Sequence, residues 1–285
     1  FSLSIGSNLI SYLGVLQDNT IENMLLPLSG NITQISTENS ASIQLEDGSW
    51  IGSLDYIEPT KGYWIRLNEG TDYGVSTYQT PIDQSYSLHL GWNLISYIGD
   101  DAVALDDALP DDVELYFTDI ISENMVAVRD EDGQWLGSLA NVGWHQLEGY
   151  WVNVSDSLTF NFDTTDNLSL LINDEIVNYR INNVIQEFEY TQSQSQSFYF
   201  FKEVEINNST ITEDDWLIAY FNGVVIGARQ WFGSNTDVPA MGFDSFNETA
   251  SYAVDNSKIN FKVYQRSTGK LIDMHGDIPR WENQS

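Results

Sequence analysis

Four aspartates in the last third of the chain have the neighbours expected of a calcium-binding loop. Asp214 and Asp215 come directly before a strand-like run, and Asp237 and Asp244 flank a Pro-Ala-Met-Gly sequence that predicts a turn. Calcium takes about six to eight oxygen ligands from carboxylates and loop carbonyl groups. We therefore expect a calcium-pinned loop, with calcium as the cofactor. The alternative is a set of ordinary loop aspartates, one of them paired with Arg229.

Four more side chains are candidates for contact with a ligand. Aromatic rings offer flat apolar surfaces that suit sugar rings, and arginine both binds carboxylates and stacks on aromatic rings. The candidates are Trp92, Trp144, Arg229 and Trp231. The alternative for each tryptophan is packing in a core, because its ring buries a large area.

Signatures of catalysis are missing from the sequence. The three histidines, His89, His145 and His275, are not spaced as a zinc-binding pair. There is no Gly-x-Ser-x-Gly elbow and no glycine pattern of a nucleotide-binding loop. With 42 acidic residues, a pair of carboxylates suited to glycoside hydrolysis can always be found, so such a pair carries no information. We expect no catalytic residue and no enzyme.

A tandem duplication organises the part of the chain that precedes the aspartates. Four sequences occur twice in the same order: NLISY at 8–12 and 93–97, EN at 38–39 and 123–124, EDGSWIGSL at 46–54 with EDGQWLGSL at 131–139, and GYWIRL at 62–67 with GYWVNV at 149–154. Two homologous modules follow from this order: module 1, residues 1–80, and module 2, residues 85–163.

Each module is expected to be a small β structure with one short helix. The Asp-Gly pair between two alternating runs predicts a hairpin, since it tolerates the positive φ of a tight turn. One or two helical turns precede Pro27 in module 1 and Pro110 in module 2. The repeated asparagine, Asn8 or Asn93, is expected to close a local turn; the alternative is contact with a ligand.

Two tryptophans of module 2 differ from the repeat. Trp92 stands where module 1 has Ser7, and Trp144 falls in a two-residue insertion. The module fold does not require these two rings, so we expect them to be better contact candidates than the repeated tryptophans.

The third segment, residues 166–285, also has the pattern of β-structure, and the polar residues 163–167 predict the boundary before it. Asn222-Gly223 indicates a hairpin, and further strands are expected at 197–206 and on both sides of Ser267-Thr268-Gly269. Short strands at this spacing predict an antiparallel β-sandwich or jelly roll. The expected fold class of the whole chain is mainly β.

The sequences DDWLIAYFNGVVIGARQW, DVPAMGFD and INFKVYQRSTG resemble a β-sandwich module of secreted multidomain proteins of marine bacteria. The repeated GWNLIS and GYWV sequences resemble a repeat of such surface proteins. The resemblance implies export and a modular surface role. Gln265 stands where that module has an aspartate, which weakens a cation site using that position.

Composition narrows the class of partner. The net charge of −31 excludes nucleic acid, because binding to phosphates needs lysine and arginine. It is explained by a solvated acidic face, by adaptation to salty water or by a surface that collects divalent cations. The chain has no cysteine and no apolar run long enough for membrane insertion. A cysteine-free chain beginning at Phe1 suggests an exported protein that has lost a leader, or a piece of a longer chain.

Three functions fit this sequence. The first is a non-enzymatic extracellular or cell-surface protein, used for adhesion or as a building block of a fibre, filament or matrix. Its partners would be other copies of itself or other surface proteins. One expected route is docking of the strand-like residues 1–5 on a neighbour. The second is a carbohydrate-binding module of a secreted polysaccharide-acting protein, with glycans as partners. The third, a hydrolase, is supported by the abundant carboxylates alone.

Overall fold

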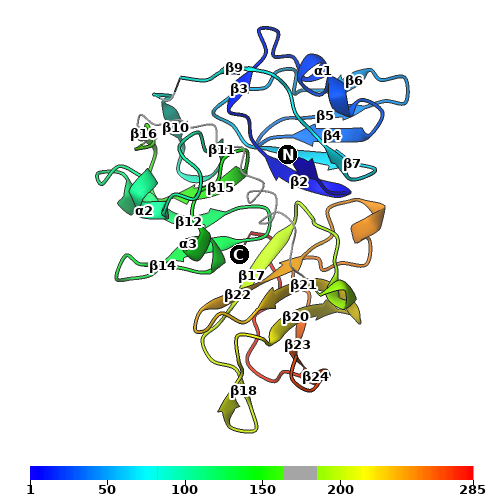
Figure 1. Ribbon diagram of the computed structural model, residues 1–285, viewed down its shortest axis with the longest axis vertical. Coiled ribbons are helices and arrows are strands. Elements are labelled where there is room, and N and C mark those ends of the chain that lie inside the picture. Colours follow the sequence, from blue (N-terminus) through cyan, green and yellow to red (C-terminus); the bar gives the residue numbers. More distant parts are fainter. Residues whose placement is uncertain (82, 164–184, 285) are drawn as a thin grey trace. The chain divides into compact units, whose positions relative to one another are not determined.

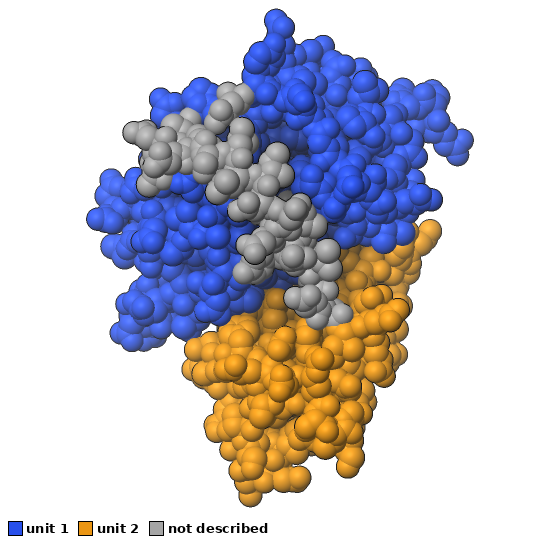
Figure 2. Space-filling model, viewed as in Figure 1, with its two compact units in different colours: residues 1–180 blue, residues 181–285 orange. Residues whose placement is uncertain are grey.

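The structure is a computed structural model that describes residues 1–81, 83–163 and 185–284. In these residues the fold is mainly β, with several antiparallel sheets and three short α-helices (Figure 1), as predicted. The chain forms two compact units, residues 1–180 and 181–285, which Figure 2 colours separately. Unit 1 contains both modules. Most of the predicted boundary at 163–167 lies outside the described residues.

Module 1 is built on a five-stranded antiparallel sheet with the strand order β2-β7-β4-β5-β6. Its elements are β1 (Ser2–Leu3), β2 (Gly6–Ile10), β3 (Gly14–Val15), α1 (Ile21–Met24), a 3-10 turn (Leu26–Leu28), β4 (Ile32–Ser36), β5 (Ala41–Gln44), β6 (Trp50–Gly52), β7 (Tyr63–Leu67), β8 (Thr71–Asp72) and β9 (Tyr78–Gln79). The strand that comes late in the sequence, β7, lies between β2 and β4.

Module 2 repeats this sheet with the strand order β11-β15-β12-β13-β14. Its elements are β10 (Tyr86–Leu88), β11 (Gly91–Ser96), α2 (Leu105–Ala108), a 3-10 turn (Glu114–Tyr116), β12 (Phe117–Ile121), β13 (Val126–Arg129), β14 (Trp135–Leu136), α3 (Ser138–Val142), β15 (Gly149–Val154) and β16 (Leu158–Phe160). The short helices α1 and α2 are the predicted ones. Helix α3 was not predicted, and it accommodates the two inserted residues.

The predicted hairpins form where the Asp-Gly pairs stand. In module 1 the Asp47 carboxylate accepts hydrogen bonds from the amide and hydroxyl of Ser49, at 3.0 and 2.6 Å, and Gly48 has φ +85°. In module 2 Asp130 accepts from the amides of Asp132 and Gln134. These aspartates and glycines therefore shape the tight turn.

The repeated asparagine closes the turn that leads into the first sheet strand. The Asn8 side chain accepts from the Ser4 amide at 2.8 Å and donates to the Ser4 carbonyl at 2.9 Å. Asn93 makes the same two bonds with His89, at 2.9 and 2.8 Å. The expected turn-closing role accounts for this side chain in both modules.

The two modules have separate hydrophobic cores. The buried side chains of the module 1 core lie between residues 3 and 73, and those of the module 2 core lie between residues 86 and 162. Each core contains the repeated tyrosines, Tyr12 and Tyr63 in module 1 and Tyr97 and Tyr150 in module 2. Burial of these large aromatic rings adds to that of the aliphatic side chains in each core and stabilises modules of this small size.

Unit 2 is a β-sandwich-type fold. Its elements are a 3-10 turn (Gln186–Phe188), β17 (Gln196–Phe201), β18 (Glu205–Ile206), β19 (Ser209–Thr210), β20 (Trp216–Phe221), β21 (Val224–Gln230), β22 (Thr236–Met241), a 3-10 turn (Asn247–Thr249), β23 (Asn260–Gln265) and β24 (Lys270–Asp273). The pair β17-β22 and the sheet β21-β20-β23-β24 share one core. The hairpin β20-β21 turns at Asn222 and Gly223, whose φ angles are +49° and +84°, as the Asn-Gly pair predicts.

One local expectation of unit 2 is wrong. The Pro-Ala-Met-Gly sequence between Asp237 and Asp244 is no turn: its first residues belong to β22, which is buried along its length. Pro239 is tolerated there because β22 pairs only with β17 in the described part of the chain.

The N-terminal strand is already paired within its own module. Ser2 and Leu3 of β1 lie opposite Asp72 and Thr71 of β8, and the Phe1 amino group donates to the Tyr73 carbonyl at 2.9 Å. One edge of β1 is therefore occupied by β8, and the docking of residues 1–5 on a neighbour stays a prediction. Over the described ranges, every helix is too short or too polar to cross a membrane.

Candidate functional site

The two modules of unit 1 meet along a seam made from residues that the repeat shares. We define the seam by five positions of module 1, Leu9, Ser11, Glu38, Gly62 and Trp64, and their counterparts in module 2, Leu94, Ser96, Glu123, Gly149 and Trp151. Each position carries the same residue type in both modules.

Two glutamates cross the seam in opposite directions. Oε2 of Glu123 accepts a hydrogen bond from the amide of Leu9 at 3.0 Å, and Oε2 of Glu38 accepts one from the amide of Leu94 at 3.3 Å. Leu9 and Leu94 lie on β2 and β11, the edge strands of the two sheets. Each glutamate thus satisfies an edge amide of the other module, which would otherwise be buried without a partner.

Backbone pairing follows the same exchange. The Ser11 amide donates to the Leu147 carbonyl at 2.9 Å, and the Ser96 amide donates to the Thr60 carbonyl at 3.2 Å. Thr60 and Leu147 occupy equivalent places, two residues before the repeated glycine of each module. These two backbone bonds, like the two glutamate bonds, therefore form a reciprocal pair between the modules.

The repeated glycines permit this close approach. A Cβ atom on Gly62 would lie 2.8 Å from the Ile95 carbonyl oxygen, and one on Gly149 would lie 2.8 Å from the Ile10 carbonyl oxygen. Contacts under 3.0 Å to a backbone atom require the backbone to shift. Glycine is therefore required at both places by the seam itself.

A small apolar cluster fills the seam. It contains Leu9, Trp64 and Leu94, all buried, with the half-buried Trp151 packed against them. None of these four belongs to either module core in the described structure. The seam is thus an isologous interface, in which the same surface of each module meets its counterpart, as in a two-fold symmetric dimer.

A histidine marks the first departure from this symmetry. Nε2 of His89 lies 2.6 Å from Oε1 of Glu38, across the seam, whereas module 1 has Ser4 at the corresponding position. The hydrogen bond to Glu38, with one to the Leu90 carbonyl, raises the pKa of His89 above its usual 6.5. The His89 side chain is 58% exposed, so solvent screens this ion pair.

A buried polar cluster near the seam is the second departure. Nδ1 of His145 lies 3.1 Å from Oδ1 of Asp101, and the Tyr150 hydroxyl donates to Glu148 at 3.2 Å. Burial lowers the pKa of His145, but the hydrogen bond to Asp101 and the charges of Glu148 and Asp101 outweigh it and raise the pKa above 6.5.

Trp92 begins a row of side chains across the outer face of the module 2 sheet. It lies opposite Asn153 on β15, which lies opposite Asp119 on β12. Nδ2 of Asn153 donates to Oδ2 of Asp119 at 2.9 Å, and Thr118 donates to the same oxygen at 2.7 Å. The half-buried Trp92 ring belongs to none of the hydrophobic clusters formed by the described residues. Among the side chains predicted to contact a ligand, Trp92 therefore keeps a ring that is partly exposed.

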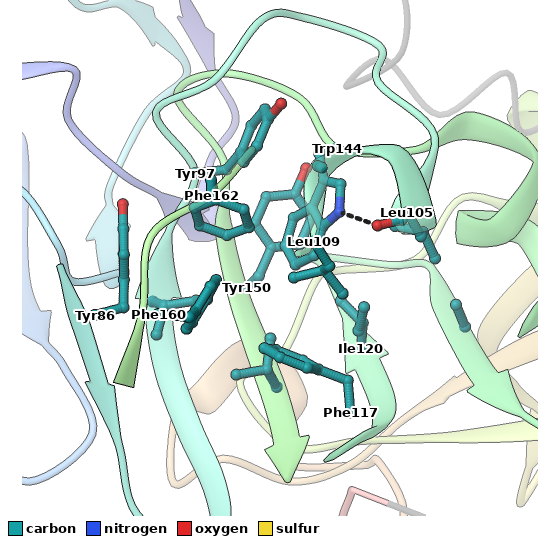
Figure 3. Packing of buried hydrophobic residues seen from close by; sticks show 14 of the residues in the cluster. Tyr86, Tyr97, Leu105, Leu109, Phe117, Ile120, Trp144, Tyr150, Phe160 and Phe162 are labelled. Atoms are coloured by element: carbon teal, nitrogen blue, oxygen red, sulfur yellow. Dashed lines mark hydrogen bonds between the residues drawn. The ribbon is translucent and has the colours of Figure 1, made fainter. Parts of the chain in front are cut away.

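Trp144 does not fit the predicted contact with a ligand. Its side chain is fully buried, and Figure 3 shows its ring among Tyr97, Tyr150 and Phe162, with Nε1 donating to the Leu105 carbonyl at 3.3 Å. Its amide donates to Val103 at 2.8 Å, as the Ile57 amide of module 1 donates to Asn19. Trp144 therefore replaces a core isoleucine, and the insertion lies before it, in α3.

Trp231 is likewise a core residue, in unit 2, with 4% of its surface exposed. Arg229 pairs with the fully buried Asp237, through Nη2 and Oδ2 at 3.0 Å and through Nε and the Asp237 carbonyl at 3.0 Å. Neither residue is placed as a ligand contact in this arrangement. The pairing of Arg229 with a carboxylate is the alternative expected from the sequence.

The other candidate calcium ligands serve the local structure. Asp215 is buried and accepts from the amides of Thr212 and Arg266 at 2.9 and 3.0 Å, while Asp214 is exposed. Asp244 accepts from the amide of Gln194 at 3.2 Å. Within the described ranges no three His, Cys, Asp or Glu side chains are grouped to hold a metal ion. Calcium binding stays a prediction.

Glu38 and Glu123 are the site residues that the sequence interpretation missed. Their signal was present, since the Glu-Asn pair is one of the sequences that recur in both modules. No protein-family model matches the chain, and neither does any curated protein or solved structure.

Proposed function

We propose that the chain is a non-enzymatic extracellular or cell-surface protein, a building block of a fibre or matrix or an adhesive component of one. The observation that supports this most is the use of the repeated polar residues. Glu38 and Glu123, together with Gly62 and Gly149, dock the modules on each other. Shared residues that dock one module on the other suit a protein whose role is to hold a shape and present surfaces.

The acidic composition supports the same proposal. A net charge of −31 favours a hydrated surface and suits other surface proteins, or further copies bridged by divalent cations, as partners. Export, the surface role and the likeness to secreted proteins of marine bacteria all belong to this proposal. Calcium in unit 2 is part of it, and a melting temperature that rises in millimolar calcium relative to EDTA would support that part.

Assembly in solution tests the proposed function. Light scattering is measured on the intact chain over increasing concentration, in high salt, with calcium or with EDTA. We expect particles larger than a monomer to form as the concentration rises. A chain that stays monomeric in every condition would contradict the building-block role. If it also binds to no cell surface or matrix, the adhesive role is contradicted as well.

A second candidate, carbohydrate binding, is favoured by the row of Trp92, Asn153 and Asp119. A half-buried indole ring beside a fixed amide and carboxylate offers one stacking surface and two polar groups, which is the composition of many small-ligand sites. A glycan array is probed with and without calcium, using the intact chain, Trp92→Ala and, as a control, Tyr56→Ala, which removes an exposed ring of module 1. Binding lost in the first variant alone would establish this function; no binding at all removes it.

A further inference from the structure

The seam surface of each module is complementary to the same surface of a homologous module, so it also fits a module of another chain. We propose that a second copy of this chain docks through the seam, with the modules exchanging partners between chains. The inference rests on the proposed building-block function and names the surface that performs it.

Consider two copies of module 1 brought together as modules 1 and 2 are in unit 1. The amide of Leu9 would meet Glu38 of the second copy, because Glu38 stands where Glu123 stands in module 2. The Ser11 amide would meet the Thr60 carbonyl of the second copy, since Thr60 is the counterpart of Leu147. The amides of Leu9 and Ser11 therefore both find an acceptor, so pairing of like modules satisfies these two donors as pairing of unlike modules does.

The modules can part without unfolding. Their cores are separate, and the seam has a small apolar cluster of its own, formed by Leu9, Trp64, Leu94 and Trp151. Opening the seam exposes these side chains and two edge strands, but it removes no side chain from a core. The free energy of opening is therefore smaller than that of unfolding either module.

The connection between the modules is short. The Thr80 amide still donates to the Leu13 carbonyl in module 1, and strand β10 of module 2 begins at Tyr86. The residues between them span about 20 Å when fully extended. A short connection that can extend once the seam opens is the usual hinge of a domain swap.

Mass action sets the concentration at which exchange occurs. A short linker gives the partner module of the same chain an effective concentration on the order of millimolar. At lower chain concentrations module 1 pairs with module 2 of its own chain. Near and above that value, pairing between chains competes, and because each chain carries two seam surfaces the product can extend beyond a dimer.

The absence of cysteine makes a thiol cross-link specific. In the variant Glu38→Cys/His89→Cys the two thiols face each other across the seam, where the native side chains lie 2.6 Å apart. The reduced chain is warmed to open the seam, cooled at low or at near-millimolar concentration, and treated with a short bis-maleimide. We expect covalent monomers at low concentration, and dimers and longer species at high concentration on a denaturing gel.

The matched control is Ser87→Cys/Thr159→Cys, whose residues lie opposite each other on β10 and β16 within module 2. Its cross-link stays within one chain whatever the modules pair with, so dimers there would reveal nonspecific aggregation. A second variant, Ser4→Cys/Glu38→Cys, tests like-module pairing. Ser4 is the counterpart of His89, so its thiols meet only when module 1 of one chain pairs with module 1 of another.

The internal cross-link of Glu38→Cys/His89→Cys at low concentration shows that the seam still closes without the Glu38 carboxylate. The proposal is overturned if this variant gives only internally cross-linked monomers at every concentration after warming and cooling. The proposal is also overturned if Glu38→Cys/His89→Cys gives no more cross-linked dimer on the gel than the control Ser87→Cys/Thr159→Cys. If light scattering still detects assembly in that case, the chain assembles through a surface other than the seam, and the building-block function is retained. Cross-linked dimers of Ser4→Cys/Glu38→Cys would extend the proposal to pairing of like modules; their absence limits exchange to module 1 with module 2.

Discussion

Removing one seam carboxylate should destabilise unit 1, although the glutamate lies in neither core. In Glu123→Ala the amide of Leu9, a residue that is 1% exposed, loses the oxygen that lies 3.0 Å from it. A buried donor left without an acceptor costs about 1–3 kcal/mol. In a unit of this size, 1 kcal/mol lowers the melting temperature by roughly 2–4 °C, so we expect a decrease of about 2–12 °C.

The control for this prediction is Glu131→Ala. Glu131 is also repeated, as Glu46 in module 1, but it is exposed in the hairpin turn of the same module. Substitutions at such positions change the free energy of unfolding by no more than about 0.5 kcal/mol. Thermal unfolding of both variants is followed by calorimetry. Equal decreases in the two variants, or none in Glu123→Ala, would refute the assignment of Glu123 to the seam.

Three further predictions concern single side chains. Trp144→Ala should lower the free energy of unfolding of module 2 by about 3–5 kcal/mol, measured by urea denaturation, because it empties a fully buried site; a change below about 1 kcal/mol would contradict its core position. The pKa of His145 is raised, so its pairing with Asp101 stabilises the fold fully below pH 6.5, and this stabilisation is lost as the pH rises through the raised pKa. The pKa of Asp101 is lowered, so its contribution is present above pH 3.8 and is lost as the pH falls through the lowered pKa. The free energy of unfolding measured from pH 3 to 9 should therefore contain a bell-shaped contribution that is absent in His145→Gln. Asp237→Ala should cost about 3–5 kcal/mol in unit 2, since it leaves Arg229 without its buried carboxylate, and a wild-type melting temperature in this variant would show that the pair is dispensable.

Local elements were predicted where the chemistry is local. The hairpin at Asp47-Gly48 and the one at Asn222-Gly223 follow from turn residues that tolerate positive φ, and both are present. The alternating apolar runs gave the mainly β fold. Strand β22 was missed because Pro239 suggests a turn. The proline is tolerated in this strand because β22 pairs with a single strand, β17, in the described residues.

The site was harder to predict because its residues act across modules. A repeat shows which residues are shared, but Leu9 and Glu38 look the same in sequence whether they serve a core, a ligand or a seam. Their partners, Glu123 and Leu94, lie far away along the chain. Trp144 was misassigned for a related reason: the alignment placed the insertion at the tryptophan, whereas the backbone bonds place it in α3.

Amide hydrogen exchange at Leu9 and Leu94 tests the central claim most directly. If the shared residues build an isologous seam, both amides are protected in the intact chain. Glu123→Ala should then accelerate exchange at Leu9, and Glu38→Ala should accelerate exchange at Leu94, each acting on the opposite module. Protection at both amides that is unchanged in both variants would contradict the seam and with it the account of why the sequence repeats.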